Sequence, residues 1–96
     1  MLRFSKLEFE WDSAKDIANQ RKHGVSFEEA KLAFDDPRRV VRPDWTHSIH
    51  EDRLFCFGKV EDNVMTVRFT IRDEKIRIIG AAYWRKGREL YEEDCL

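Results

Sequence analysis

Residues 53–83 read RLFCFGKVEDNVMTVRFTIRDEKIRIIGAAY, and they carry the clearest strand pattern of the chain. Three apolar-rich runs, separated by two short polar turns, lie at 53–60, 63–72 and 76–83. In the middle run, apolar and polar residues alternate from Met65 onward and place Arg68 and Arg72 on the polar face. Alternation of this kind is typical of strands that bury one face, and strands joined by tight turns pair antiparallel. The stretch therefore predicts a three-stranded antiparallel unit.

The residues before this unit predict one short strand and two helices. Apolar and acidic residues alternate at 7–11, which indicates a strand. Asp12 or Ser13 can cap a helix that stops at Gly24, a residue that adopts the left-handed conformation readily. A capping box at 26–29 begins a second short helix, which Asp36 and Pro37 end.

The remaining segments complete the expected α+β architecture. Residues 38–50 look irregular apart from a short strand at 39–42, and a last helix is expected over 86–94. We therefore predict an antiparallel β-sheet with an N-terminal helix pair and a C-terminal helix packed against it. At 96 residues the chain suits a single domain, 1–96.

Composition supports a soluble globular protein whose charge is unevenly distributed. The chain is 42% hydrophobic and carries a net charge of −1, so bulk charge alone does not indicate a nucleic-acid binder. Residues 64–90, however, hold seven Lys and Arg against three Asp and Glu. Local positive potential is enough to bind phosphate groups.

The cysteine and histidine pattern predicts no cofactor and no metal. Cys56 and Cys95 form no Cys-x-x-Cys motif, which favours reduced thiols in a cytoplasmic protein, although a disulfide between them stays open. His47 and His50 are too weak a pattern to indicate a metal. The chain has no apolar run of transmembrane length, so no membrane association is expected.

The last predicted helix carries its charges in the unfavourable order. Basic residues lie at its start (Arg85, Lys86 and Arg88) and acidic ones at its end, against the helix dipole. One interpretation is functional: a basic helix start beside Tyr83 and Trp84 suits a phosphate and a stacked base. The alternative is a solvated helix with an ordinary Arg88–Glu92 pair.

Other candidates for chemistry have competing structural explanations. The strand residues could form a phosphate-binding surface or simply make cross-strand ion pairs on a solvated face; they are Glu51, Arg53, Arg68, Arg72 and Arg77. Lys22 and His23 suit a helix C-terminus, yet an imidazole can also act as acid or base. Trp11 and most Phe residues should be core, whereas Trp45 in a loop could contact a partner or RNA.

The order of these motifs resembles the BrnT family along nearly the whole chain. The resemblance is carried by Phe9-Glu10-Trp11-Asp12, Lys15, Asn19, the run from Lys22 to Ala30, Phe34-Asp35-Asp36-Pro37, His47-Ser48, Glu51, Arg53, Gly58 and Arg77-Ile78-Ile79. It implies a fold similar to the RelE ribonucleases and the toxin half of a type II toxin–antitoxin pair. It also implies RNA cleavage that blocks translation, and neutralisation by a BrnA-type antitoxin, through which operator DNA would be contacted only indirectly.

The ending departs from the family pattern. Where the family has roughly Ser-Ala-Arg after two isoleucines, this chain has Gly80-Ala81-Ala82 and continues Tyr-Trp-Arg-Lys-Gly, so Ala82 replaces the expected arginine. Two interpretations follow: a metal-independent endoribonuclease toxin, or a catalytically weak module that binds an antitoxin-like DNA-binding partner. For the enzyme, the expected catalytic residues are Glu51, Arg53, Arg77, Arg85, Lys86 and His23. The expected RNA-binding residues are Arg68, Arg72, Tyr83, Trp84, Arg88 and Lys22.

Overall fold

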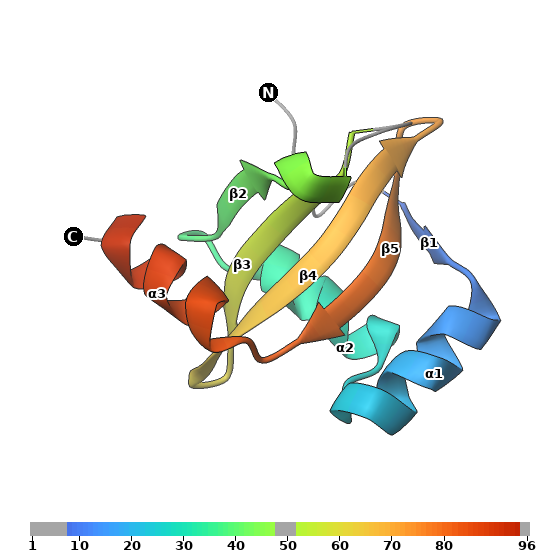
Figure 1. Cartoon of the computed structure of the whole chain (residues 1–96), viewed down its shortest axis with the longest axis horizontal. Coiled ribbons are helices and arrows are strands. Elements are labelled where there is room, and N and C mark those ends of the chain that lie inside the picture. Colours follow the sequence, from blue (N-terminus) through green and yellow to red (C-terminus); the bar gives the residue numbers. More distant parts are fainter. Residues whose placement is uncertain (1–7, 48–51, 95–96) are drawn as a thin grey trace.

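The computed structural model describes residues 8–47 and 52–94 and contains one mixed five-stranded sheet with helices on both faces (Figure 1). In chain order the elements are β1 (Phe9–Trp11), α1 (Ser13–His23), α2 (Phe27–Ala30), the 3-10 helix η2 (Lys31–Asp35), β2 (Val40–Pro43), the 3-10 helix η3 (Trp45–His47), β3 (Leu54–Val60), β4 (Asn63–Arg72), β5 (Lys75–Ala82) and α3 (Arg85–Asp94). The predicted α+β class and the order of the elements are confirmed. The single-domain assignment over 1–96 stays a prediction.

The sheet order is β1-β5-β4-β3-β2, and one of its four pairings is parallel. Strands β3 to β5 form the predicted three-stranded antiparallel unit, and β2 pairs antiparallel with β3. In contrast, β1 pairs parallel with β5 through Phe9↔Ile76 and Trp11↔Ile78. The prediction of a purely antiparallel sheet is therefore wrong at this edge. The physical reason is that β1 joins its neighbour through two α-helices, two 3-10 helices and three strands, and not through a tight turn.

Local sequence signals explain where the N-terminal helices begin and end. The Asp12 carboxylate accepts a hydrogen bond from the Ala14 backbone N–H at 2.8 Å, and Gly24 ends α1 with a φ of 68°. The Ser26 and Glu29 side chains form the predicted capping box. The helix that follows has only four α-helical residues, and it continues as the tighter η2 up to Asp35.

Neighbouring residues of β3 point into different cores. Cys56 belongs to the larger cluster beneath the N-terminal helices, whereas Phe57 packs with Val64 and Tyr91 on the α3 side. Glycines permit the close contact of helix and sheet on each face. A Cβ atom at Gly58 would overlap the Ala33 backbone of η2, and one at Gly87 would overlap the Thr66 side chain.

The Asp36 carboxylate ties α3 to the opposite layer. It accepts hydrogen bonds from the Tyr91 hydroxyl at 2.7 Å and from the Lys59 and Arg38 backbone N–H groups, each at 2.8 Å. Burial raises the pKa of Asp36, but these hydrogen bonds and the Lys59 charge outweigh burial and hold the pKa below its ordinary value.

Replacing Tyr91 by phenylalanine should lower the free energy of unfolding at pH 7 by about 1–2 kcal/mol, because the hydroxyl donates to a charged carboxylate. Because the folded-state pKa of Asp36 is lowered, its stabilising contribution is complete above the unfolded value of about 3.9 and is lost as the pH falls through the folded value. Urea denaturation should therefore show the difference between Tyr91→Phe and the native chain shrinking in acid. Tyr83→Phe, at a half-exposed position, is the control and should change stability by less than about 0.5 kcal/mol. If the difference in unfolding free energy between Tyr91→Phe and the native chain stayed constant from pH 7 into acid, the Tyr91–Asp36 hydrogen bond would not have the role described.

Candidate functional site

A hollow of about 260 Å³ lies on the side of the sheet that carries α3, next to the part that the helix covers. Phe55, Arg68 and Gly80 occupy paired positions on β3, β4 and β5, so they share this face. The lining residues come from three strands, from α1 and from the segment before α3: Asn19, His23, Phe55, Thr66, Arg68, Gly80, Ala81, Ala82 and Trp84. We call this hollow the sheet pocket. It brings together His23, Arg68 and Trp84, three of the residues predicted from sequence.

Aromatic and cationic groups form one wall of the sheet pocket. The Phe55 and Trp84 ring centroids are 5.8 Å apart with an interplanar angle of 41°, and the Arg68 guanidinium carbon lies 5.5 Å from the Phe55 centroid. Arg68 Nε is 3.3 Å from a carboxylate oxygen of Asp44, a residue only 4% exposed. The N–H of that atom is not aligned on a hydrogen-bond acceptor, so the contact with Asp44 is an ion pair only.

Helix α1 brings His23 to the pocket because Asn19 fixes the helix to β5. The Asn19 side chain donates to the carbonyl oxygens of Ala81 and Val25, each at 2.8 Å, and accepts from the Ala81 backbone N–H at 3.2 Å. Strand β1 pairs only with Ile76–Ile78 of β5, so the backbone groups of Ala81 at this edge need other partners. The Asn19 side chain provides them. His23 is the last residue of α1 and lies at the rim.

A second hollow, of about 290 Å³, lies at the start of α3. Its lining includes Tyr83, Arg85 and Arg88, and Trp84 is shared with the sheet pocket. Burial, with smaller effects of Glu29 and Glu61, raises the pKa of Tyr83, so its hydroxyl keeps its proton at neutral pH. Tyr83 and Trp84 therefore lie between Arg68, which lines the sheet pocket, and Arg85 and Arg88, which line the second hollow.

Two of the basic residues of α3 each have an acidic side chain close by. Arg85 Nε lies 3.8 Å from a Glu89 oxygen, and Arg88 Nε lies 3.7 Å from a Glu92 oxygen, as the solvated-helix interpretation also expects. Both pairs are open to solvent, and the Arg85 side chain is 86% exposed. Such pairs contribute little stability, so both guanidinium groups can turn to an anionic ligand at small cost.

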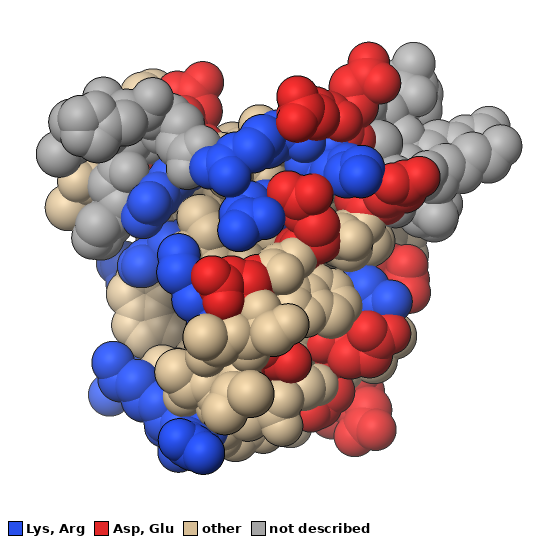
Figure 2. Space-filling view, turned by 90° about the vertical axis from the view of Figure 1, so that its right-hand side faces the viewer, with Lys and Arg blue, Asp and Glu red and all other residues tan. Residues whose placement is uncertain are grey.

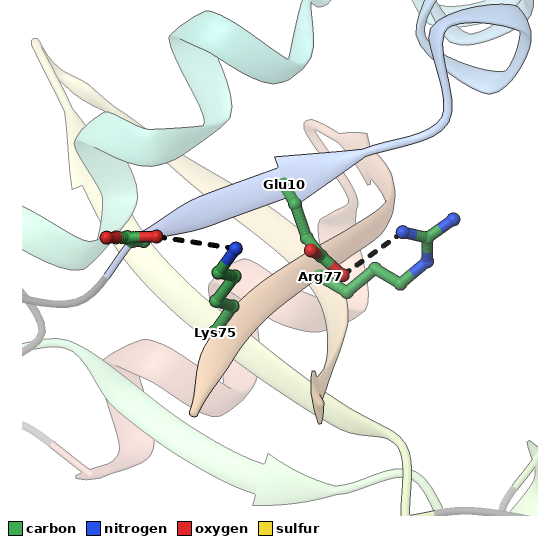
Figure 3. A network of polar contacts seen from close by, with 4 residues as sticks. Glu10, Lys75 and Arg77 are labelled. Atoms are coloured by element: carbon green, nitrogen blue, oxygen red, sulfur yellow. Dashed lines mark hydrogen bonds and ion pairs between the residues drawn. The ribbon is translucent and has the colours of Figure 1, made fainter. Parts of the chain in front are cut away.

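The other predicted cations do not line either hollow. Arg77 lies on β5 and makes an ion pair of 3.1 Å with Glu10 of β1 (Figure 3). Lys22, Arg72 and Lys86 are exposed, and Arg53 directly precedes β3. Glu51 lies outside the described residues, as do His50 and Cys95.

The surface charge is mixed and not uniformly basic. Figure 2 shows one face on which groups of Lys and Arg side chains alternate with Asp and Glu side chains. No group of three His, Cys, Asp or Glu side chains lies at metal-binding distance within residues 8–47 and 52–94. No helix in those ranges is both long and apolar enough to cross a membrane. Burial raises the pKa of the Cys56 thiol to about 12, so Cys56 is no nucleophile at neutral pH.

The structure adds site residues that sequence reasoning did not single out as functional. Phe55 looked like a core residue, Asp44 lay in a segment without a pattern, and Asn19 was part of a helix surface. One signal was available for Asn19, because a polar residue buried in a helix must find partners. Gly80 and Ala82 matter because they carry little or no side chain, and this leaves the pocket open.

The structure therefore defines a small α+β fold with an aromatic and cationic site on one sheet face. Residues 11–87 match the model of the ribonuclease toxin BrnT of type II toxin–antitoxin systems, and the chain belongs to this family. A comparison with curated proteins gave no significant match. The resemblance found in the sequence is confirmed, and membership in a type II toxin family implies an antitoxin partner.

Proposed function

We propose that this chain is a metal-independent endoribonuclease that cuts RNA on the sheet face around the sheet pocket and so inhibits translation. The observation that supports this most is the meeting of His23, Arg68 and Trp84 from three separate parts of the chain. Metal-free RNA cleavage needs a proton acceptor and donor, a cation at the phosphate and a surface that holds the bases.

In the proposed reaction, the ribose 2′-oxygen attacks the adjacent phosphorus. A base, His23 or Glu51, removes the 2′-hydroxyl proton as the O2′–P bond forms. The P–O5′ bond breaks, and an acid returns a proton to the leaving 5′-oxygen. The products are a 2′,3′-cyclic phosphate and a 5′-hydroxyl, and no oxidant, reductant or cofactor is consumed.

The predicted cations take different parts in this proposal. Arg68 lies closest to the reacting groups and stabilises the charge of the phosphorane, and Arg53 lies directly before the neighbouring strand. Residues at the start of α3 hold the flanking phosphates, and Tyr83 and Trp84 stack bases. Arg85, Lys86 and Arg88 supply this phosphate contact. Lys22 of α1 and Arg72 at the end of β4 contact more distant phosphates of the strand. Arg77 supports the site indirectly, because its ion pair with Glu10 joins β1 to β5.

The proposed antitoxin is a BrnA-type protein that contacts operator DNA, and the complex is cytoplasmic. The antitoxin uses apolar surface together with charged residues. Trp45 in η3, at 81% exposed, is the strongest apolar candidate for that contact.

A catalytically weak interaction module is the second candidate, and Ala82 is the observation that favours it. Ala82 lines the sheet pocket where the family resemblance leads us to expect arginine. In this alternative the chain keeps the antitoxin surface and has lost a catalytic cation.

Expression of the chain without its partner separates the two candidates. We expect growth to stop and RNA to be degraded, and co-expression of the small protein encoded beside it should restore growth. The comparison is the double variant Arg85→Ala with Lys86→Ala, which should lose toxicity yet still bind the antitoxin. A harmless unmodified chain that leaves RNA intact would favour the interaction module.

A further inference from the structure

The sheet pocket exists because β5 has almost no side chains at its floor. A Cβ atom at Gly80 would meet only the Asn19 Oδ1 atom, at 3.9 Å, so the space above this glycine is open. Ala82, two residues further along β5, adds only a methyl group. The volume of about 260 Å³ is just below the roughly 300–1,000 Å³ of sites for whole small molecules. The pocket is therefore the right size for one ring system.

Its wall suits a flat aromatic ligand. Trp84 is 44% exposed although it contacts Phe55, so part of its ring faces the pocket and solvent. The angle of 41° between the two rings leaves no parallel slot between them. A planar ligand therefore stacks on Trp84 alone, with Phe55 against its edge.

The polar lining includes Arg68, which can donate hydrogen bonds to such a ligand. The Asp44 ion pair and the Phe55 ring hold Arg68 in place, and its side chain is 36% exposed, so its guanidinium group can donate hydrogen bonds into the pocket. The Thr66 hydroxyl lies against Gly87 under α3, so it does not take part in this contact. A guanidinium group in this position matches the ring nitrogens and carbonyl oxygens of a base.

We propose that the sheet pocket binds a single unstacked nucleobase of an RNA strand, which stacks on Trp84 with its polar edge toward Arg68. This inference rests on the proposed action on RNA, but it requires binding only and not cleavage. A base held here would give the toxin a sequence preference at one position of its substrate. Phosphate contacts at the start of α3 cannot provide such a preference.

Filling the pocket tests this inference. The probes are short single-stranded RNAs of each of the four bases, made with 2′-fluoro sugars so that they cannot be cut, and the same strand with one abasic position. Tryptophan fluorescence of the full chain, freed of its antitoxin, measures affinity. Gly80→Val should weaken binding about ten-fold or more and abolish the difference between bases. The dependence of affinity on salt should not change, because the phosphate contacts remain.

The matched control is Ala18→Leu on the exposed surface of α1, which adds the same three carbon atoms away from the pocket. It should bind like the native chain. The proposal would be overturned if Gly80→Val kept the affinity and the base preference of the native chain. It would also be overturned if the native chain bound the abasic strand as tightly as the intact strand. If Gly80→Val lost antitoxin binding while its RNA binding stayed unchanged, the proposal would fail too, because the pocket would then receive a protein side chain. If the native chain cleaves RNA and Gly80→Val changes nothing, only the nucleobase pocket is refuted. If the native chain binds RNA with a base preference but does not cleave it, only the proposed enzyme activity is refuted.

Discussion

Replacing His23 by alanine is expected to lower the rate of RNA cleavage by about 10²–10⁴-fold, the usual loss when a general acid or base is removed. His23 is the described side chain best suited to this role, because it ends α1 at the rim of the sheet pocket that Arg68 also lines. The fold should tolerate the change, since alanine is a good helix former and His23 is exposed. Single-turnover cleavage of a defined RNA measures the effect.

Arg21→Ala is the matched control for this experiment. It removes an exposed side chain from the same last turn of α1, at a residue that lines neither hollow. Cleavage by this variant should stay within about two-fold of the native rate, and both variants should keep the native urea midpoint. If His23→Ala cleaved RNA at the same rate as Arg21→Ala, His23 would be a helix-terminal residue only, and Glu51 would remain as the candidate base.

Replacing Gly58 by alanine is expected to lower the free energy of unfolding by roughly 3 kcal/mol, at the upper end of the usual cost of overpacking. The added Cβ atom would lie 2.7 Å from the carbonyl carbon and 2.8 Å from the Cα of Ala33. Both atoms belong to the backbone of η2, so no side-chain rotation relieves the overlap. Against a total stability of about 5–15 kcal/mol, the loss is large.

Gly80→Ala provides the comparison on the opposite face of the sheet. Its Cβ atom has no neighbour closer than 3.9 Å, and glycine within a strand is itself unfavourable. This variant should be as stable as the native chain or slightly more stable. Urea denaturation of the two variants side by side checks the result. Equal midpoints would mean that η2 does not pack on β3 as described.

Most of the fold follows from local patterns because the signals are short-range. The alternation in 63–72 matches β4, whose bounds are Asn63–Arg72. The caps at Asp12 and Ser26 and the stop at Gly24 fixed the helix ends. The pairing of β1 with β5 could not be predicted in the same way, because three residues of strand carry no information on direction.

The site was harder to predict, because its geometry depends on contacts between distant residues. Sequence reasoning singled out Arg68 and Trp84, but the pocket between them depends on Gly80 and on the anchoring of α1 by Asn19. Asp44 and Phe55 had no pattern that linked them to Arg68 before the sheet register was known. Arg77, proposed for the catalytic group, lies opposite Glu10 in a place that only the parallel edge strand creates.

The most direct test is to incubate the purified chain, freed of its antitoxin, with RNA in the presence of excess EDTA, and to analyse the new ends. A metal-independent ribonuclease should cut the RNA under these conditions and leave 5′-hydroxyl and 2′,3′-cyclic phosphate ends. RNA that stays intact, or that is cut only when a divalent metal ion is added, would contradict metal-independent cleavage by this chain.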